Sequence, residues 1–138
     1  MHTQKAMHVF TGISCSLLLM YFLVGCAFDI AHVRYTDTRL KIDGQGTKSF
    51  TLGADLSLSE MPCGYGRTLK KETRWIMVGS IEQGSVYKSR DQVLTVECSN
   101  VHEAYLVVAE KSLRGFYLPV EKGYVPLSSP IRMVINEN

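Results

Sequence analysis

His102 and Glu103 are neighbouring residues whose types could do acid–base chemistry. A histidine titrates near neutral pH, and a carboxylate can orient it, so such a pair can transfer protons. Adjacent residues of a β-strand point to opposite faces, however, so these side chains can cooperate only from a loop. We favour the alternative interpretation, in which the two residues belong to a solvated turn.

Common catalytic motifs are missing from the chain, which contains no G-x-S-x-G, no H-E-x-x-H and no P-loop. Gly64-Tyr65-Gly66-Arg67 lacks the spacing and the lysine with which a P-loop holds phosphate. The formal net charge of +2 is too small to favour a nucleic-acid partner. We therefore expect a protein that is not an enzyme, has no cofactor and does not bind nucleic acid.

The first 25 residues differ in composition from the rest of the chain. They contain Lys5 and no acidic residue, and a nearly continuous apolar run extends from Ile13 to Val24. This pattern is typical of a secretory signal peptide. The run is shorter than the roughly 20 residues that span a bilayer. A buried core helix is the alternative, but the apolar residues surround the whole axis instead of forming one stripe.

The segment Leu23-Val24-Gly25-Cys26 ends this apolar run and resembles the lipobox of bacterial lipoproteins. The resemblance implies that a diacylglyceryl group is attached to the Cys26 thiol and that the chain is cleaved before Cys26. The new amino group is then usually acylated as well, with palmitate as the expected chain. Two or more acyl chains give stable membrane anchoring. A chance cysteine at the end of a membrane anchor is the alternative.

The resemblance also implies a location in the bacterial cell envelope. In Gram-negative lipoproteins, an aspartate after the lipidated cysteine favours retention in the inner membrane, and this chain has Ala27 there. We therefore expect an outer-membrane protein that faces the periplasm. The predicted organisation is a signal peptide over residues 1–25, a lipidated tether over 26–31 and one β-rich globular domain over 32–138.

Two cysteines, Cys63 and Cys98, remain once Cys15 is assigned to the signal peptide and Cys26 to lipid. An even number in an oxidising compartment predicts a disulfide. Two unrelated buried thiols are the alternative, since the sequence does not show whether the cysteines approach each other. A zinc site needs four ligands at close spacing, and the predicted mature chain adds only the distant His32 and His102. We therefore expect no metal.

The segment 32–138 contains a series of short β patterns separated by turn residues. Residues 48–58 alternate well and predict a strand with a bend at Gly53. Residues 74–81 are continuously apolar and predict a central strand with a bulge at Gly79. We interpret 59–71 as an ordered loop held at Cys63, and 101–103 as a link or a helical turn. The remaining predicted strands are 32–42, a brief edge segment at 86–87, 92–98, 104–109, 113–120 and 131–135.

Seven or eight short strands at this spacing predict an all-β fold, either a small β-sandwich or a barrel. Two groups of side chains are candidate partner contacts within it. The first is basic and could meet anionic headgroups or an acidic partner, although a solvated loop is the alternative. The second is aromatic, and one of the neighbours Phe116 and Tyr117 should face outward, next to Tyr124, unless both sheet faces are buried. The basic group comprises Arg67, Lys70, Lys71 and Arg74.

These observations favour a membrane-anchored envelope lipoprotein that acts as a binding or structural module and docks onto another envelope component. The alternative is a periplasmic carrier or sensor for a lipid or other small molecule, because a small barrel can hold one ligand. An apolar pocket would favour the carrier, whereas an exposed apolar patch with charges around it would favour docking.

Overall fold

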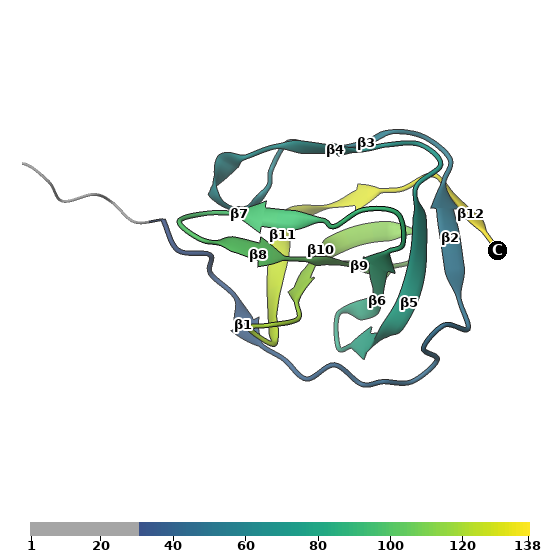
Figure 1. The fold of residues 1–138 in the computed structure, drawn as a ribbon, viewed down its shortest axis with the longest axis horizontal. Coiled ribbons are helices and arrows are strands. Elements are labelled where there is room, and N and C mark those ends of the chain that lie inside the picture. Colours follow the sequence, from purple (N-terminus) through teal and green to yellow (C-terminus); the bar gives the residue numbers. More distant parts are fainter. Residues whose placement is uncertain (1–30) are drawn as a thin grey trace, which may run out of the picture. The chain divides into compact units, whose positions relative to one another are not determined.

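The structure, a computed structural model, describes residues 31–138, so the predicted signal peptide and Cys26 lie outside the described residues. The described chain consists of β-strands joined by turns, with one short 3-10 helix, η1 (Pro62–Gly64) (Figure 1). The strands are β1 (Thr36–Asp37), β2 (Ser49–Leu52), β3 (Leu56–Leu58), β4 (Arg67–Leu69), β5 (Arg74–Ile81), β6 (Gly84–Ser89), β7 (Thr95–Glu97), β8 (Val101–Glu103), β9 (Tyr105–Ala109), β10 (Ser112–Leu118), β11 (Gly123–Arg132) and β12 (Ile135–Glu137).

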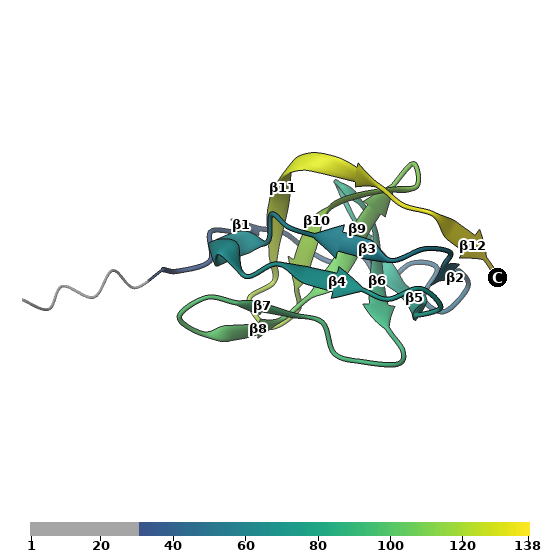
Figure 2. The ribbon, with the colours of Figure 1, turned by 90° about the horizontal axis from the view of Figure 1, so that it is seen from above.

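Eight of these strands form one antiparallel sheet in the order β1-β11-β10-β9-β6-β5-β2-β12. Its edges are β1 and β12, which do not pair with each other, so the sheet is not closed into a barrel. Two small sheets, β3–β4 and β7–β8, lie over one face of the large sheet (Figure 2). The all-β prediction is confirmed, and the layered arrangement excludes the closed-barrel alternative.

The strand predicted over residues 48–58 is divided into β2 and β3. Its alternation places Phe50, Leu52, Leu56 and Leu58 in the interior, as expected. The chain bends at Gly53, where a Cβ would lie 2.8 Å from a methyl group of Val134. After the bend, β3 leaves the large sheet and pairs with β4, which lies inside the segment predicted as a loop. Such divisions explain why the fold has more and shorter strands than predicted.

The central strand β5 has the predicted bounds, and its alternate residues are buried. The register between β5 and β6 shifts between Met77 and Gly79, which confirms the predicted bulge. The prediction of a brief edge segment at 86–87 is wrong, because β6 lies inside the sheet between β5 and β9. Residues 101–103, one alternative for which was a helical turn, form β8 and pair with β7.

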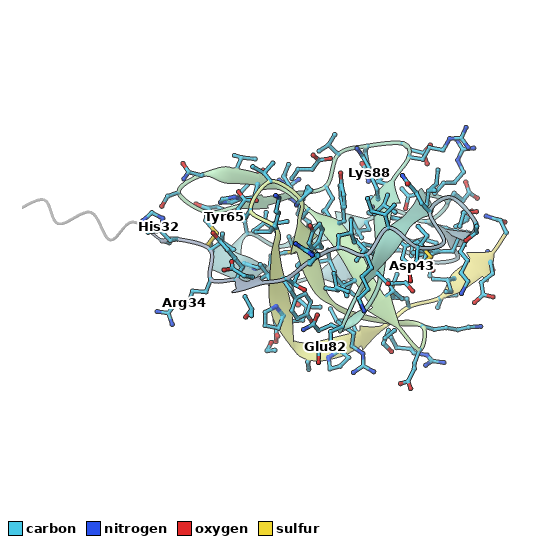
Figure 3. The ribbon with its side chains drawn as sticks, turned by 90° about the horizontal axis from the view of Figure 1, so that it is seen from below. His32, Arg34, Asp43, Tyr65, Glu82 and Lys88 are labelled. Carbon is cyan, nitrogen blue, oxygen red and sulfur yellow. A yellow bond between two sulfur atoms is a disulfide. The ribbon has the colours of Figure 1, made fainter. Side chains whose placement is uncertain are left out.

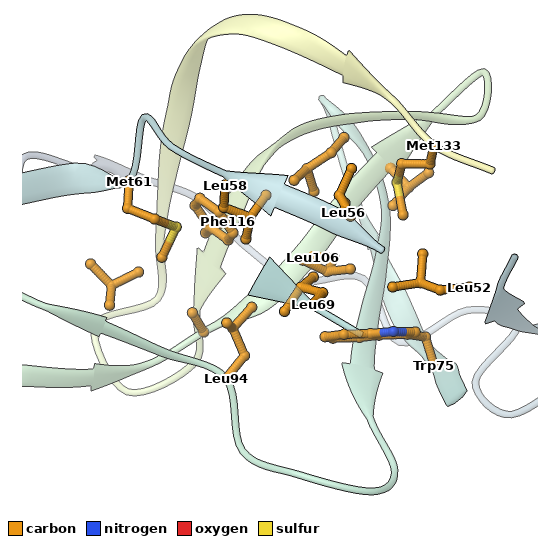
Figure 4. Close-up of a cluster of buried hydrophobic side chains, with 14 of the residues drawn as sticks. Leu52, Leu56, Leu58, Met61, Leu69, Trp75, Leu94, Leu106, Phe116 and Met133 are labelled. Atoms are coloured by element: carbon orange, nitrogen blue, oxygen red, sulfur yellow. The ribbon is translucent and has the colours of Figure 1, made fainter. Parts of the chain in front are cut away.

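Side chains on both faces of the large sheet are buried. The first cluster lies between the sheet and the two small sheets, and includes Phe50, Trp75 and Phe116 (Figure 4). A second cluster lies on the opposite face of the same strands. Because apolar area removed from water stabilises the fold by about 25 cal/mol per Å², each face needs a cover. The second cluster consists of Ile81, Val86, Val107, Tyr117 and Tyr124, with Leu40, Val78 and Tyr105 packed against it.

Residues 38–42, which we call the strap, cover the second cluster. The Thr38 backbone N–H donates to the Lys122 carbonyl, at 2.9 Å, next to β11. Farther along, Lys41 and Ser80 exchange backbone hydrogen bonds of 2.8 and 2.9 Å, so the strap reaches β5. The strand predicted over 32–42 is therefore reduced to β1 and this isolated bridge, since the remaining residues cross the sheet instead of joining it.

A disulfide joins Cys63 in η1 to Cys98 after β7, with the two Cα atoms 5.3 Å apart. This pairing agrees with the prediction from the cysteine count. Arg67 on β4 also forms an ion pair with Glu97 on β7. These two links hold the small sheets together where they cover the first cluster.

Removing the disulfide in a Cys63→Ala/Cys98→Ala double variant should lower the free energy of unfolding by about 3–4 kcal/mol, because a loop closed over 35 residues no longer restricts the unfolded chain. Urea unfolding followed by Trp75 fluorescence measures the difference. As a control, a reducing agent should destabilise the wild type and leave the double variant unchanged. Equal stability of the two oxidised proteins would contradict the prediction.

The close packing of the strap on β5 requires a glycine at position 79. Gly79 has φ 155°, and a Cβ there would collide with the Lys41 carbonyl. We expect Gly79→Ala to destabilise the domain by about 2–4 kcal/mol through overpacking and backbone strain. Gly46→Ala is the matched control, because Gly46 also has positive φ but no atom lies within 4 Å of its Cβ position. Equal losses in the two variants, measured by urea unfolding, would refute the close contact.

Candidate interaction site

The favoured interpretation of His102 and Glu103 as a solvated turn is wrong, because both residues lie in β8 and the His102 side chain is largely buried, and the two side chains do not interact with each other. His102 Nδ1 lies 2.6 Å from Oε1 of Glu121, whereas Oε1 of Glu103 lies 3.4 Å from Nζ of Lys88. Both residues belong to β8, whose successive side chains point to opposite sides. Sequence reasoning missed Glu121, because it lies in a turn 19 residues from its partner and no local pattern connects the two.

The contact between His102 and Glu121 fastens the turn after β10 to β8. Both side chains are largely buried, and the second carboxylate oxygen of Glu121 has no hydrogen-bond partner in the described part of the chain. A hollow of about 340 Å³ lies beside the pair and is also lined by Ala31, His32 and Asn100. Cys98 also lines this hollow, but its sulfur is engaged in the disulfide. The pair therefore provides one hydrogen-bond acceptor, the second carboxylate oxygen of Glu121, and it links the turn after β10 to β8.

The basic residues predicted to contact a partner are mostly engaged in ion pairs. Arg67 pairs with Glu97, Lys70 Nζ lies 3.2 Å from Asp55, and an Arg74 guanidinium nitrogen lies 2.9 Å from Asp91. The Lys71 backbone N–H donates to the Asp55 carboxylate at 2.7 Å. Three of the four positive charges are thus neutralised by nearby carboxylates, so the group does not present a free cationic surface.

These contacts also affect the ionisation of the carboxylates. The hydrogen bonds from the Arg74 side chain and backbone lower the pKa of the Asp91 carboxyl. The hydrogen bonds from the Lys71 backbone and the Lys70 side chain lower the pKa of the Asp55 carboxyl in the same way. Both shifts favour the charged form in the folded protein.

Of the two alternatives for Phe116 and Tyr117, the structure shows burial of both sheet faces, and neither side chain faces outward. Phe116, Tyr117 and Tyr124 have exposed fractions of only 0%, 4% and 8%. The two neighbours do point to opposite faces of β10, but both faces are covered. Phe116 packs in the first cluster and Tyr117 in the second, while the Tyr124 hydroxyl donates to the Arg114 carbonyl at 3.0 Å.

An open hollow of about 860 Å³ lies between the strap and the end of β10, and we call it the strap groove. Figure 3 shows the domain from this side. Asp37 and strap residues line one wall, while Tyr117 and Pro119 contribute to the other. Ile42 is 74% exposed there. The complete lining consists of Asp37, Thr38, Arg39, Leu40, Ile42, Tyr117, Pro119, Glu121 and Lys122.

The lining of the strap groove combines apolar surface with charges of both signs. Leu40, Ile42, Tyr117 and Pro119 supply the apolar surface. Such a combination resembles the surfaces that proteins use for one another, with an apolar centre and a polar rim. Tyr117 lines this groove, but it is buried and does not form the exposed aromatic contact considered from the sequence.

The space between the large sheet and the small sheets is filled by side chains. Trp75, Leu69 and Leu106 lie at its centre and are shielded from solvent (Figure 4). Within residues 31–138, no three His, Cys, Asp or Glu side chains gather closely enough to hold a metal ion. No helix in the described region has the length and apolar character needed to cross a bilayer.

No family model matches the sequence, and neither the curated proteins nor the solved structures contain a match to it.

The lowered pKa of Asp91 predicts a pH-dependent contribution to stability. A carboxyl whose pKa is lower in the folded than in the unfolded chain stabilises the fold above the unfolded value of about 3.9, and this contribution is lost as the pH falls through the folded value. The stability difference between wild type and Asp91→Asn should therefore be largest above pH 5 and shrink toward pH 2. Urea unfolding across this range measures it.

Glu82→Gln is the matched control, because Glu82 is exposed and forms no salt bridge with another residue of 31–138. The difference in unfolding free energy between Glu82→Gln and the wild type should not show the decrease between pH 5 and pH 2 that we expect for Asp91→Asn. A difference for Asp91→Asn that is constant with pH would show that the contact with Arg74 does not form in solution.

Proposed function

We propose that the chain is a lipoprotein of the bacterial cell envelope, anchored through lipid on Cys26, and that its β domain binds an extended segment of another envelope protein in the strap groove. The groove is the observation that carries the binding role. The anchor is supported by the lipobox resemblance of Leu23-Val24-Gly25-Cys26 after an apolar run. Ala27 after the cysteine supports an outer-membrane location facing the periplasm.

The chemistry of the groove defines the partner. Ile42 and Leu40 provide apolar contact, while Arg39 and Lys122 can pair with acidic groups and Asp37 with basic ones. A protein segment with apolar and charged side chains in alternation complements such a lining, whereas a purely apolar ligand would leave the charges unpaired. The groove is also open to solvent, so a segment of another protein can enter it.

The filled interior favours docking over the carrier alternative. A carrier for a lipid needs a cavity that surrounds the ligand, typically of 300–1,000 Å³. Here large side chains such as Trp75 and Phe116 occupy the centre of the fold. The groove could accept a small molecule, but it would leave much of the ligand exposed to water.

The anchor is tested by a Cys26→Ser variant expressed in a Gram-negative host. We expect the protein to move from the membrane fraction to the soluble fraction or to accumulate with its signal peptide, because the serine hydroxyl does not accept the lipid. Cys15→Ser is the matched control and should remain in the membrane fraction. An unchanged distribution and apparent mass of Cys26→Ser would contradict the anchor.

The groove is tested by placing a photoreactive amino acid at position 42 and irradiating intact cells. We expect a covalent adduct with one envelope protein at high yield, because Ile42 projects from the strap beside the groove. A photoreactive residue in place of Val134, which is also exposed but lies between β11 and β12, is the control. Identical adducts from the two positions, or none from position 42, would contradict a partner in the groove.

A further inference from the structure

Three segments of the described chain meet at one end of the domain, which we call the tether end. They are residues 31–35, residues 62–65 and residues 98–101. The Ser99 backbone N–H and hydroxyl both donate to the Ala31 carbonyl, at 3.0 and 2.8 Å. The disulfide between Cys63 and Cys98 ties the second segment to the third. Figure 3 shows His32, Arg34 and Tyr65 at this end of the domain.

The tether end exposes apolar side chains without acidic ones. Tyr65 and Val101 have exposed fractions of 61% and 68%, and Tyr35 is also exposed. The three segments contain Arg34 and no aspartate or glutamate. Tyrosine is favoured where an apolar environment meets water, and an arginine beside it can reach anionic headgroups. The composition of this end therefore matches a lipid surface of negative charge.

The length of the chain before residue 31 adds an independent constraint. Five residue steps separate Cys26 from Ala31, and each step extends by at most about 3.6 Å, so the two lie no more than about 18 Å apart. A lipid on Cys26 would thus hold this end of the domain close to the headgroups. The C-terminus lies at the other end of the domain (Figures 1 and 2).

We propose that the tether end is a membrane-contacting surface, on which Tyr65 and Val101 insert among the headgroups of an anionic bilayer and Arg34 pairs with lipid phosphate. This inference rests on the lipid anchor of the proposed function. It specifies which face of the domain meets the membrane. The disulfide then serves to hold the two apolar side chains on a common surface.

Hydrogen exchange of the lipidated protein in vesicles of phosphatidylethanolamine and phosphatidylglycerol tests this orientation. We expect the backbone amides of the tether end to exchange at least about threefold more slowly in the wild type than in a Tyr65→Glu/Val101→Glu double variant, since contact with lipid suppresses local opening. Val134→Glu, which changes an exposed valine away from this end, should exchange like the wild type at these amides.

The intact mass of each purified protein separates the two proposals. If lipid is present and the wild type and double variant exchange equally fast at the tether end, the membrane-contacting surface is refuted while the anchor stands. If the mass shows no lipid, the anchor is refuted, and the membrane-contacting surface with it. Unchanged far-ultraviolet circular dichroism and a cooperative thermal unfolding transition verify that the variants fold.

Discussion

Burial on both faces of one sheet is the constraint on which the rest of this structure depends. Along β10, Phe116 and Tyr117 point to opposite sides, and neither reaches solvent. A single layer of strands cannot bury the apolar side chains on both of its faces, because those on an uncovered face would remain in water. The chain solves this with two different covers, the small sheets on one face and the strap on the other. The small sheets are linked by the disulfide and by the ion pair of Arg67 with Glu97.

Each cover also creates one of the two surfaces to which we assign a role. The strap contacts the second face through Leu40 and through its hydrogen bonds at Lys41, but it is too narrow to fill the space beside β10. The strap groove is the consequence. On the opposite face, Tyr65 follows the disulfide-bonded Cys63 by two residues and is exposed at the tether end. Folding requirements and the proposed docking and anchoring surfaces therefore share the same residues.

Local patterns were sufficient to predict part of this architecture. The continuous apolar run of β5 and the glycine at its bulge are properties of adjacent residues, so the strand and the shift at Gly79 followed from the sequence. The strap, the interior position of β6 and the contact of His102 with Glu121 depend on residues far apart in the chain. For the same reason, the burial of Tyr117 could not be derived from β10 alone, since the residues that cover it come from another part of the chain. Of the candidate contact residues, only Tyr117 lines the groove, and it is buried.

The envelope location and the membrane-contacting surface both depend on the lipid anchor at Cys26, and mass spectrometry of the N-terminal tryptic peptide of membrane-extracted protein tests this anchor directly. Trypsin cleaves after Arg34, so the processed protein should release a peptide that begins at Cys26 and carries a diacylglyceryl group, with or without a further acyl chain. An unmodified peptide that begins before Cys26 and continues through it would contradict the lipid anchor. In that case, the orientation of the domain at a membrane would lose its basis.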